Sequence, residues 1–136
     1  MTDWEFANAT LVYTALPKYL AGMDHFIARY VFGEGAVPLT PYQYPMWLLD
    51  SVERDTIRAA CGVYLDRSDE CWVFAADNGV FMDTVETVLG LGIHDGVLRE
   101  MEWAKEWDQP VLIHRIDIDT QEITRVGEWH GPGDFS

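Results

Sequence analysis

Glu100 is the residue whose type and position point most directly to chemistry. The apolar spacing over residues 96–108 predicts a helix in which Val97, Met101 and Ala104 share one face, and Glu100 projects beside that face. A half-buried carboxylate is therefore expected. Carboxylates held partly out of water are typical of functional sites, because they can attack an electrophilic carbon or exchange a proton there.

The elements around Glu100 predict where it lies. Residues 70–76 form an apolar, strand-like run, and the helix that carries Glu100 begins after His94-Asp95-Gly96. In open α/β sheets, ligands bind outside the carboxyl ends of the strands, where the N-termini of helices also point. We therefore expect Glu100 to face a crevice at that edge of a sheet.

Strand-like and helical segments alternate along the chain. The predicted strands cover 10–15, 36–39, 70–76, 110–118 and 122–128, and the predicted helices cover 21–31, 47–65 and 96–108. Between them, 80–91 is predicted to form a short helix or lid that ends at Gly90 and Gly92. The alternation predicts an α/β fold, a three-layer sandwich with a mainly parallel four- or five-stranded sheet (flavodoxin/Rossmann-like) and a C-terminal antiparallel hairpin.

Length and composition indicate one folded domain. The 136 residues are 49% hydrophobic and 13% aromatic, which excludes a disordered chain and is enough for one core. We assign residues 1–136 to a single domain with a loose tail at 129–136. No apolar run approaches the roughly 20 residues that span a bilayer. The acidic N-terminus lacks the features of a secretory signal, so a soluble, cytoplasmic protein without a membrane partner is expected.

The charge and the cysteines narrow the classes of partner. The net charge of -14 argues against binding to polymeric nucleic acid, which depends on clustered Lys and Arg. It leaves a small nucleoside or nucleotide open, with a mild preference for the uncharged nucleoside. Cys61 and Cys71 lack a CxxC spacing, so two buried thiols are favoured over a disulfide or a metal site.

The sequence predicts no metal site and no cofactor. The histidines show neither HxxxH nor HxH spacing, and a glycine-rich phosphate loop, a GxSxG elbow and a Cys-His nucleophile pattern are all missing; the four histidines are His25, His94, His114 and His130.

Four segments in the correct order resemble the nucleoside 2-deoxyribosyltransferase-like superfamily, and most closely its small uncharacterised branch. The resemblance covers roughly residues 10–114. The segments are 11–15 (LVYTA), 37–44 (VPLTPYQY), 68–74 (SDECWVF) and 96–104 (GVLREMEWA). In enzymes of this superfamily the last segment begins a helix and supplies a glutamate that attacks the anomeric carbon of a nucleoside.

The resemblance implies that Glu100 is the nucleophile and that Tyr13 orients it. The superfamily typically has an acidic residue six places before the glutamate, but this chain has His94 there and Asp95 one step later. Either Asp95 takes over its role, or the contact with the base differs, or the site is not a transferase site. The resemblance also implies a homo-oligomer, a dimer or higher.

The implied chemistry is cleavage of an N-glycosidic bond. Positive charge develops on the sugar as the bond breaks, and a carboxylate near C1′ stabilises it or traps it as a glycosyl-enzyme. Asp95 or Asp77 can assist proton transfer to the leaving base. Aromatic faces at three positions can stack on a base. The expected substrate-binding residues are Tyr42, Tyr44, Trp47, Asp77, His94 and Gly96.

Each of these residues also has a purely structural interpretation. Glu100 can be a solvated residue or a partner of Arg99 or Lys105, and Tyr13 can be a core tyrosine whose hydroxyl is satisfied. The main hypothesis is N-glycosidic cleavage or transfer on a nucleoside or nucleotide through Glu100. The alternatives are a non-catalytic module that binds or senses a nucleotide-derived ligand on the same fold, and a structural or interaction protein.

Overall fold

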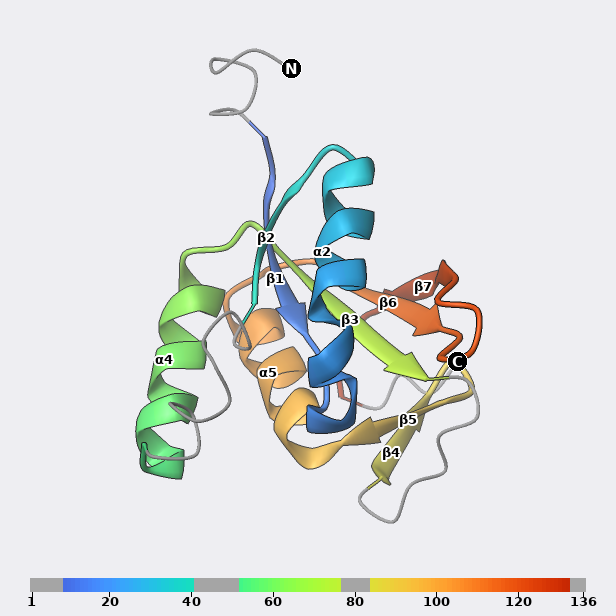
Figure 1. The fold of residues 1–136 in the computed structure, drawn as a ribbon. Coiled ribbons are helices and arrows are strands. Elements are labelled where there is room, and N and C mark those ends of the chain that lie inside the picture. The colour runs from blue at the N-terminus through green and yellow to red at the C-terminus, as the bar shows by residue number, and fades with distance from the viewer. Residues whose placement is uncertain (1–8, 41–51, 77–83, 133–136) are drawn as a thin grey trace.

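The computed structural model describes residues 9–40, 52–76 and 84–132, in which a central sheet lies between two layers of helices (Figure 1). The main sheet of this described part has five strands in the order β2-β1-β3-β6-β7. The first four are parallel to their neighbours, and β7 is antiparallel to β6. The strands are β1 (Leu11–Ala15), β2 (Val37–Leu39), β3 (Glu70–Ala76), β6 (Val111–Ile116) and β7 (Ile123–Trp129). The predicted fold class is confirmed.

Helices cover both faces of the sheet. The 3₁₀ helix η1 (Lys18–Met23) continues directly into α2 (Asp24–Gly33), which packs on one face. Gly35, with φ of 81°, follows α2 and permits the turn into β2. The opposite face carries α4 (Arg54–Asp66) and α5 (Asp95–Glu106).

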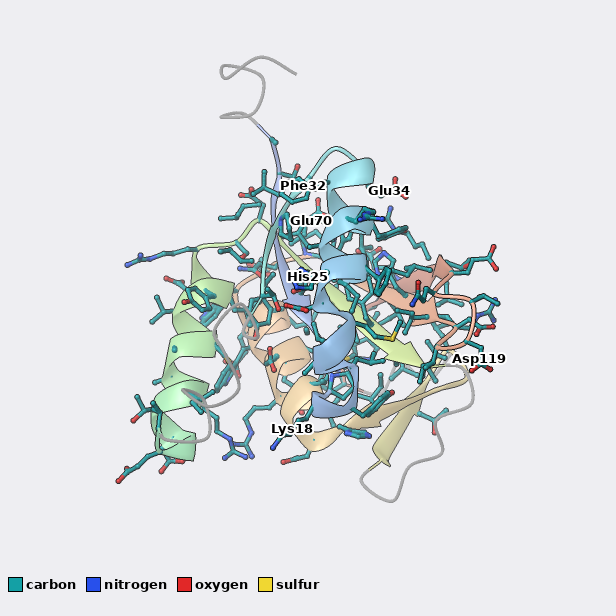
Figure 2. The ribbon with its side chains drawn as sticks, in the orientation of Figure 1. Lys18, His25, Phe32, Glu34, Glu70 and Asp119 are labelled. Atoms are coloured by element: carbon teal, nitrogen blue, oxygen red, sulfur yellow. The ribbon has the colours of Figure 1, made fainter. Side chains whose placement is uncertain are left out.

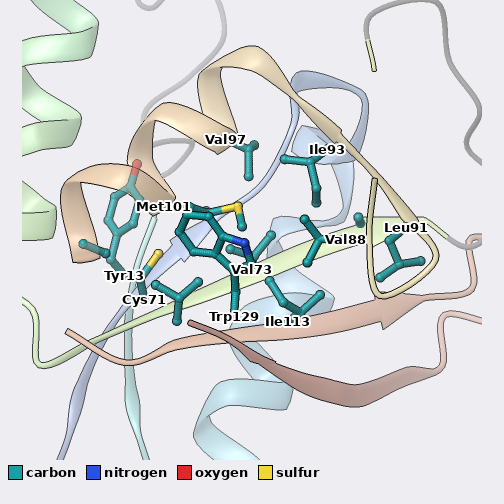
Figure 3. Close-up of a cluster of buried hydrophobic side chains, with 14 of the residues drawn as sticks. Tyr13, Cys71, Val73, Val88, Leu91, Ile93, Val97, Met101, Ile113 and Trp129 are labelled. Carbon is teal, nitrogen blue, oxygen red and sulfur yellow. The ribbon is translucent and has the colours of Figure 1, made fainter. Parts of the chain in front are cut away.

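The two cores follow from the alternation of side chains along the central strand β3. Cys71 and Val73 point to the α5 face, where they meet Met101 and other apolar residues (Figure 3). Trp72 and Phe74 point to the α2 face. A strand buried on both faces needs a continuous apolar run, which is what 70–76 supplies.

The segment predicted as a short helix or lid is instead a β-hairpin, so that prediction was wrong. Strands β4 (Thr84–Val88) and β5 (Leu91–His94) pair antiparallel. The run TVETV is rich in β-branched residues, which favour strands. Leu89 and Gly90 have φ of 51° and 81°, as a tight hairpin turn requires, so Gly90 marks this turn and not the end of a helix.

The hairpin packs on the α5 face of the sheet. Val88, Leu91 and Ile93 join the buried cluster that contains Trp129 of β7. Leu89 fits against Gly127 so closely that a Cβ on Gly127 would lie 2.8 Å from Leu89 Cδ1. Because β5 leads directly into α5, this packing sets where α5 begins.

Two boundaries differ from the sequence prediction. The helix predicted over 47–65 begins at Arg54 in the structure, and its first residues, 47–51, lie outside the described residues. The predicted tail at 129–136 was wrong at Trp129, which ends β7 and is buried. Residues 133–136 lie outside the described part.

The two edges of the sheet are easily distinguished. Figure 2 shows Lys18, at the start of η1 after β1, on the carboxyl side, whereas Phe32 and Glu70 lie at the opposite end. Since α5 follows β5 and leads back toward β6, its N-terminus lies at the carboxyl edge and its C-terminus at the amino edge. This arrangement agrees with the expected position of a ligand site in an open α/β sheet.

Candidate functional site

Glu100 lies in the middle of α5, next to the apolar stripe that the sequence predicts. Val97, Met101 and Ala104 are buried against the sheet. Glu100 itself is half-buried, and its Oε2 atom is fully enclosed without a hydrogen-bond partner among the described residues. The prediction of a half-buried carboxylate is confirmed. A buried carboxyl oxygen without a donor costs stability, so it calls for an explanation.

Tyr13 of β1 brings its hydroxyl to this carboxyl. The side chain is completely buried, and Figure 3 shows the ring pointing from the strand toward α5. The hydroxyl approaches Glu100 closely enough to interact with it electrostatically. Even so, neither the Tyr13 hydroxyl nor Glu100 Oε2 has a well-aligned hydrogen bond within the described part of the chain. The two groups thus face each other, and each can still make a further hydrogen bond.

The burial of this pair changes the acidity of both groups. Burial raises the pKa of Glu100 from 4.5 to about 8, and the Tyr13 hydroxyl partly offsets this by favouring the carboxylate. The pKa of Tyr13 is raised well above its usual value, first by burial and then by the negative charge of Glu100. Perturbed acidity of a residue beside an orphaned polar group is characteristic of functional sites.

Two thiols border the pair. Cys61 of α4 is half-buried and Cys71 of β3 is fully buried, and both are free, as the sequence predicts. Burial, followed by the charge of Glu100, raises the pKa of Cys61 to about 11. The same two causes raise the pKa of Cys71 well above its usual value, while Lys105 lowers it in part. Both side chains therefore remain protonated thiols at neutral pH.

The first turn of α5 carries three of the predicted site residues. His94 is the N-cap residue, although its side chain does not cap the helix. Asp95 is exposed, and its carboxylate lies 3.7 Å from the guanidinium of Arg99. Gly96 has open space around the position of a Cβ. These residues lie at the carboxyl edge of the sheet, but none of them joins the Tyr13–Glu100 pair, and their roles stay predictions.

Tyr19 of η1 is a residue at this edge that the sequence analysis missed. Its hydroxyl accepts a hydrogen bond of 3.1 Å from the backbone N–H of Ala76, the last residue of β3. Its ring packs against the ring of His94, with centroids 5.1 Å apart. Tyr19 thereby joins the end of β3 to the start of α5. The only sequence signal is its place just after the first strand, which did not reveal this contact.

Four of the predicted site residues lie outside the described residues. They are Tyr42, Tyr44, Trp47 and Asp77. In the part of the chain that the structure describes, no three His, Cys, Asp or Glu side chains gather as a metal site would require. Over those same ranges, no helix combines the length and the apolar character needed to cross a bilayer.

Comparison with known proteins is informative at the level of structure. No protein-family model matches the sequence, and no curated protein matches it either. Among solved structures, the chain is similar to a 2-desoxiribosyltransferase from Leishmania mexicana, with a TM-score of 0.57 and 14% sequence identity. The similarity covers 88% of this chain and 81% of that protein. The chain has the deoxyribosyltransferase-like fold.

At this level of identity the similarity concerns the fold. It supports the resemblance inferred from the four sequence segments to that extent. In this fold, strand β1 lies in the sheet and helix α5 lies in the layer of helices that packs on it. The reaction itself has to be argued from Glu100 and its neighbours.

Proposed function

We propose that this protein is a distant member of the nucleoside 2-deoxyribosyltransferase-like superfamily that cleaves or transfers the N-glycosidic bond of a nucleoside or nucleotide, with Glu100 as the nucleophile. The main support is the enclosed Oε2 atom of Glu100, which has no hydrogen-bond partner among the described residues and lies beside the hydroxyl of Tyr13. A carboxyl group in this state destabilises the fold, which is explained if the group is kept for chemistry.

The proposed reaction has two steps. A carboxylate oxygen of Glu100 forms a bond to C1′ while the C1′–N bond breaks, and the electron pair of that bond leaves with the base. The base takes up a proton, for which Asp95, Asp77 and water are the candidate donors. Water or a second base then attacks C1′ and releases the carboxylate. Tyr13 donates its hydrogen to the carboxyl and keeps it oriented.

The pKa of Glu100 determines the pH range in which this reaction can proceed. Since its pKa is about 8, the nucleophilic carboxylate is the minor form at neutral pH. We therefore expect the reaction rate with limiting substrate to rise with pH toward an inflection near 8. A bound substrate that develops positive charge favours the carboxylate, so the rate at saturating substrate should show its inflection at lower pH.

The same observation favours one alternative. A carboxyl group that holds its proton at neutral pH is a hydrogen-bond donor, as a non-catalytic module for a nucleotide-derived ligand would use. Such a protein would bind its ligand without turnover. Its thermal stability would still increase with ligand concentration.

Incubation with a panel of ribonucleosides, deoxyribonucleosides and their monophosphates tests the proposal, read out by release of free base. Replacement of Glu100 by Ala or Gln should lower the rate by at least about 10³-fold. Glu102, exposed on the same helix, provides the matched control, and Glu102→Gln should retain the wild-type rate. If no member of the panel is cleaved but one stabilises the protein, the binding module is the correct interpretation.

A further inference from the structure

The direction of the chain across the main sheet reverses between strands β1 and β3. From β1 the chain moves outward to β2 on one side, and it then crosses back to β3 on the other side, with all three strands parallel. In open α/β sheets, ligands bind outside the carboxyl ends of the two strands at such a reversal. These ends are Ala15 of β1 and Ala76 of β3. Side chains gathered beside them are therefore candidates for contact with a ligand.

The imidazole of His94 lies beside these strand ends, where Tyr19 holds it. Tyr19 belongs to η1, which follows β1, and its hydroxyl accepts a hydrogen bond of 3.1 Å from the backbone N–H of Ala76. The ring of His94 packs on the ring of Tyr19, with centroids 5.1 Å apart and planes inclined by 58°. The Nε2 atom of His94 is enclosed, as is Oε2 of Glu100. Segments from three parts of the chain thus place one imidazole at the reversal.

The position of His94 on α5 also relates it to Glu100. His94 is the N-cap residue of this helix, and Glu100 follows six residues later, which is about 9 Å along the helix axis. Side chains on a helix lean toward its N-terminus, so the carboxyl of Glu100 is directed toward the end where His94 lies. Glu100 faces Tyr13 of β1, and His94 contacts Tyr19 just after β1. Both groups therefore adjoin the same strand.

Asp95 is turned away from this side of the helix. Five residues separate it from Glu100, which corresponds to about 140° around the helix. Its side chain is 62% exposed, and its carboxylate lies 3.7 Å from the guanidinium of Arg99. The carboxylate of Asp95 is thus directed at solvent and at Arg99. Asp77, the other acidic candidate, lies outside the described residues.

We propose that His94 is the catalytic residue that protonates the leaving base, and that this base is a purine. The inference rests on the proposed function. In an in-line displacement the leaving group departs on the side of C1′ opposite the nucleophile, so a substrate attacked by Glu100 can extend its base toward His94. The two fused rings of a purine span the separation of about 9 Å better than the single ring of a pyrimidine does.

The proton and the electrons balance in each step. As Glu100 bonds to C1′, the electron pair of the C1′–N bond passes to the base, and an imidazolium N–H of His94 transfers its proton to a ring nitrogen of the base. In the second step the neutral imidazole accepts a proton from the water or the second base that attacks C1′. Imidazole suits this exchange because it gives up and takes back a proton near neutral pH.

The test compares a nucleoside that needs a proton donor with one that does not. Guanine must take up a proton as it leaves guanosine, whereas the base of 7-methylguanosine is already positively charged and leaves as a neutral molecule. Both are supplied as ribonucleosides and as 2′-deoxyribonucleosides, and release of free base is measured. We expect His94→Gln to slow the release of guanine by about 10²-fold or more, and that of 7-methylguanine by less than about threefold. A purely structural role would slow both releases equally.

His25→Gln is the matched control, because the side chain of His25 is 94% exposed, and it should retain both rates. If His94→Gln does not fold, His94→Asn takes its place in the same comparison. Equal slowing of the two releases would overturn this inference and leave the proposed function standing, and so would a wild-type protein that cleaves only pyrimidine nucleosides. A wild-type protein that releases base from no nucleoside would overturn both.

Discussion

The carboxyl of Glu100 and the hydroxyl of Tyr13 face each other between helix α5 and strand β1, and neither Oε2 of Glu100 nor the hydroxyl has a well-aligned hydrogen bond within the described residues. Each group would be better solvated in the unfolded chain. The fold holds them there because Val97, Met101 and Ala104 fix α5 on the sheet, and β1 is buried between two layers. The pair is therefore a local source of instability that the surrounding packing tolerates.

Replacement of Glu100 by Gln should stabilise the protein at neutral and alkaline pH. The folded-state pKa of about 8 exceeds the unfolded value near 4.5, so the folded state binds the proton more tightly. The contribution of Glu100 to stability is therefore present below about pH 4.5 and is lost as the pH rises through 8. The variant should gain on the order of 2–5 kcal/mol at pH 9 relative to pH 4. Urea unfolding across this range measures it, and a gain that does not depend on pH would contradict the assignment.

Removal of the Tyr13 hydroxyl should change the acidity of Glu100 more than the stability of the fold. The hydroxyl lowers the pKa of Glu100, so Tyr13→Phe should raise its ionisation midpoint and shift any pH–rate profile toward alkaline pH. The unfolding free energy should change by less than about 1 kcal/mol, because the hydroxyl has no well-aligned hydrogen bond to any described residue. Tyr64→Phe, on a half-buried tyrosine of α4, is a control whose midpoint should equal that of wild type.

His114 should make the fold sensitive to acid. Its ring is buried and stacks on Phe74 at 4.7 Å, and its Nε2 accepts a hydrogen bond from Arg125. Burial and the charge of Arg125 lower the pKa from 6.5 to about 4, so the unfolded state binds the proton more tightly. Stability is therefore lost as the pH falls from about 6.5 through 4, by up to roughly 3 kcal/mol.

Denaturant unfolding of His114→Gln between pH 7 and 4 checks this expectation. The glutamine variant should be less stable at pH 7 and should lose this part of the acid sensitivity. His25→Gln is the control, since the side chain of His25 is 94% exposed. An acid response identical in wild type and His114→Gln would show that other groups cause it.

The close contact between Leu89 and Gly127 should help to hold the β4–β5 hairpin in place. A Cβ on Gly127 would approach Leu89 Cδ1 to 2.8 Å, so in Gly127→Ala the end of the Leu89 side chain must move, and the variant should lose no more than about 1 kcal/mol of stability. Leu89→Ala removes the opposing methyl groups, and the double variant should be more stable than the sum of the two single effects predicts. Additive losses in a double-mutant cycle would mean that the two residues do not interact.

The outer side of the α4–α5 pair should take part in self-association. Val63 is 47% exposed and Trp107 is 42% exposed, and Trp103 packs 3.7 Å from the Cβ position of Gly62 between the two helices. We expect light scattering to give the mass of a dimer or a larger oligomer. Trp107→Ser should shift the distribution toward monomer, whereas Phe32→Ser, at the far end of α2, should not. A monomeric wild-type protein would rule out this surface as an interface.

The amino-acid sequence by itself determined most of the elements and the character of Glu100. The run over 70–76 predicts a strand buried on both faces, and the spacing around Glu100 predicts its place beside an apolar stripe. Both predictions succeed because the pattern of buried residues along one element follows from the periodicity of its own sequence. The segment 80–91 was misjudged because a glycine in a tight turn and a glycine after a helix look alike without knowledge of strand pairing.

Only the tertiary structure decided which side chains surround the Glu100 carboxyl. Tyr13, Cys61 and Cys71 come from three elements that are distant in sequence, and their meeting depends on strand order and on how α4 and α5 pack. The contact between Tyr19 and His94 has the same origin. The carboxyl oxygen without a hydrogen-bond partner among the described residues, and the raised pKa of Glu100, are properties of this packing, because burial exists only once the layers are assembled.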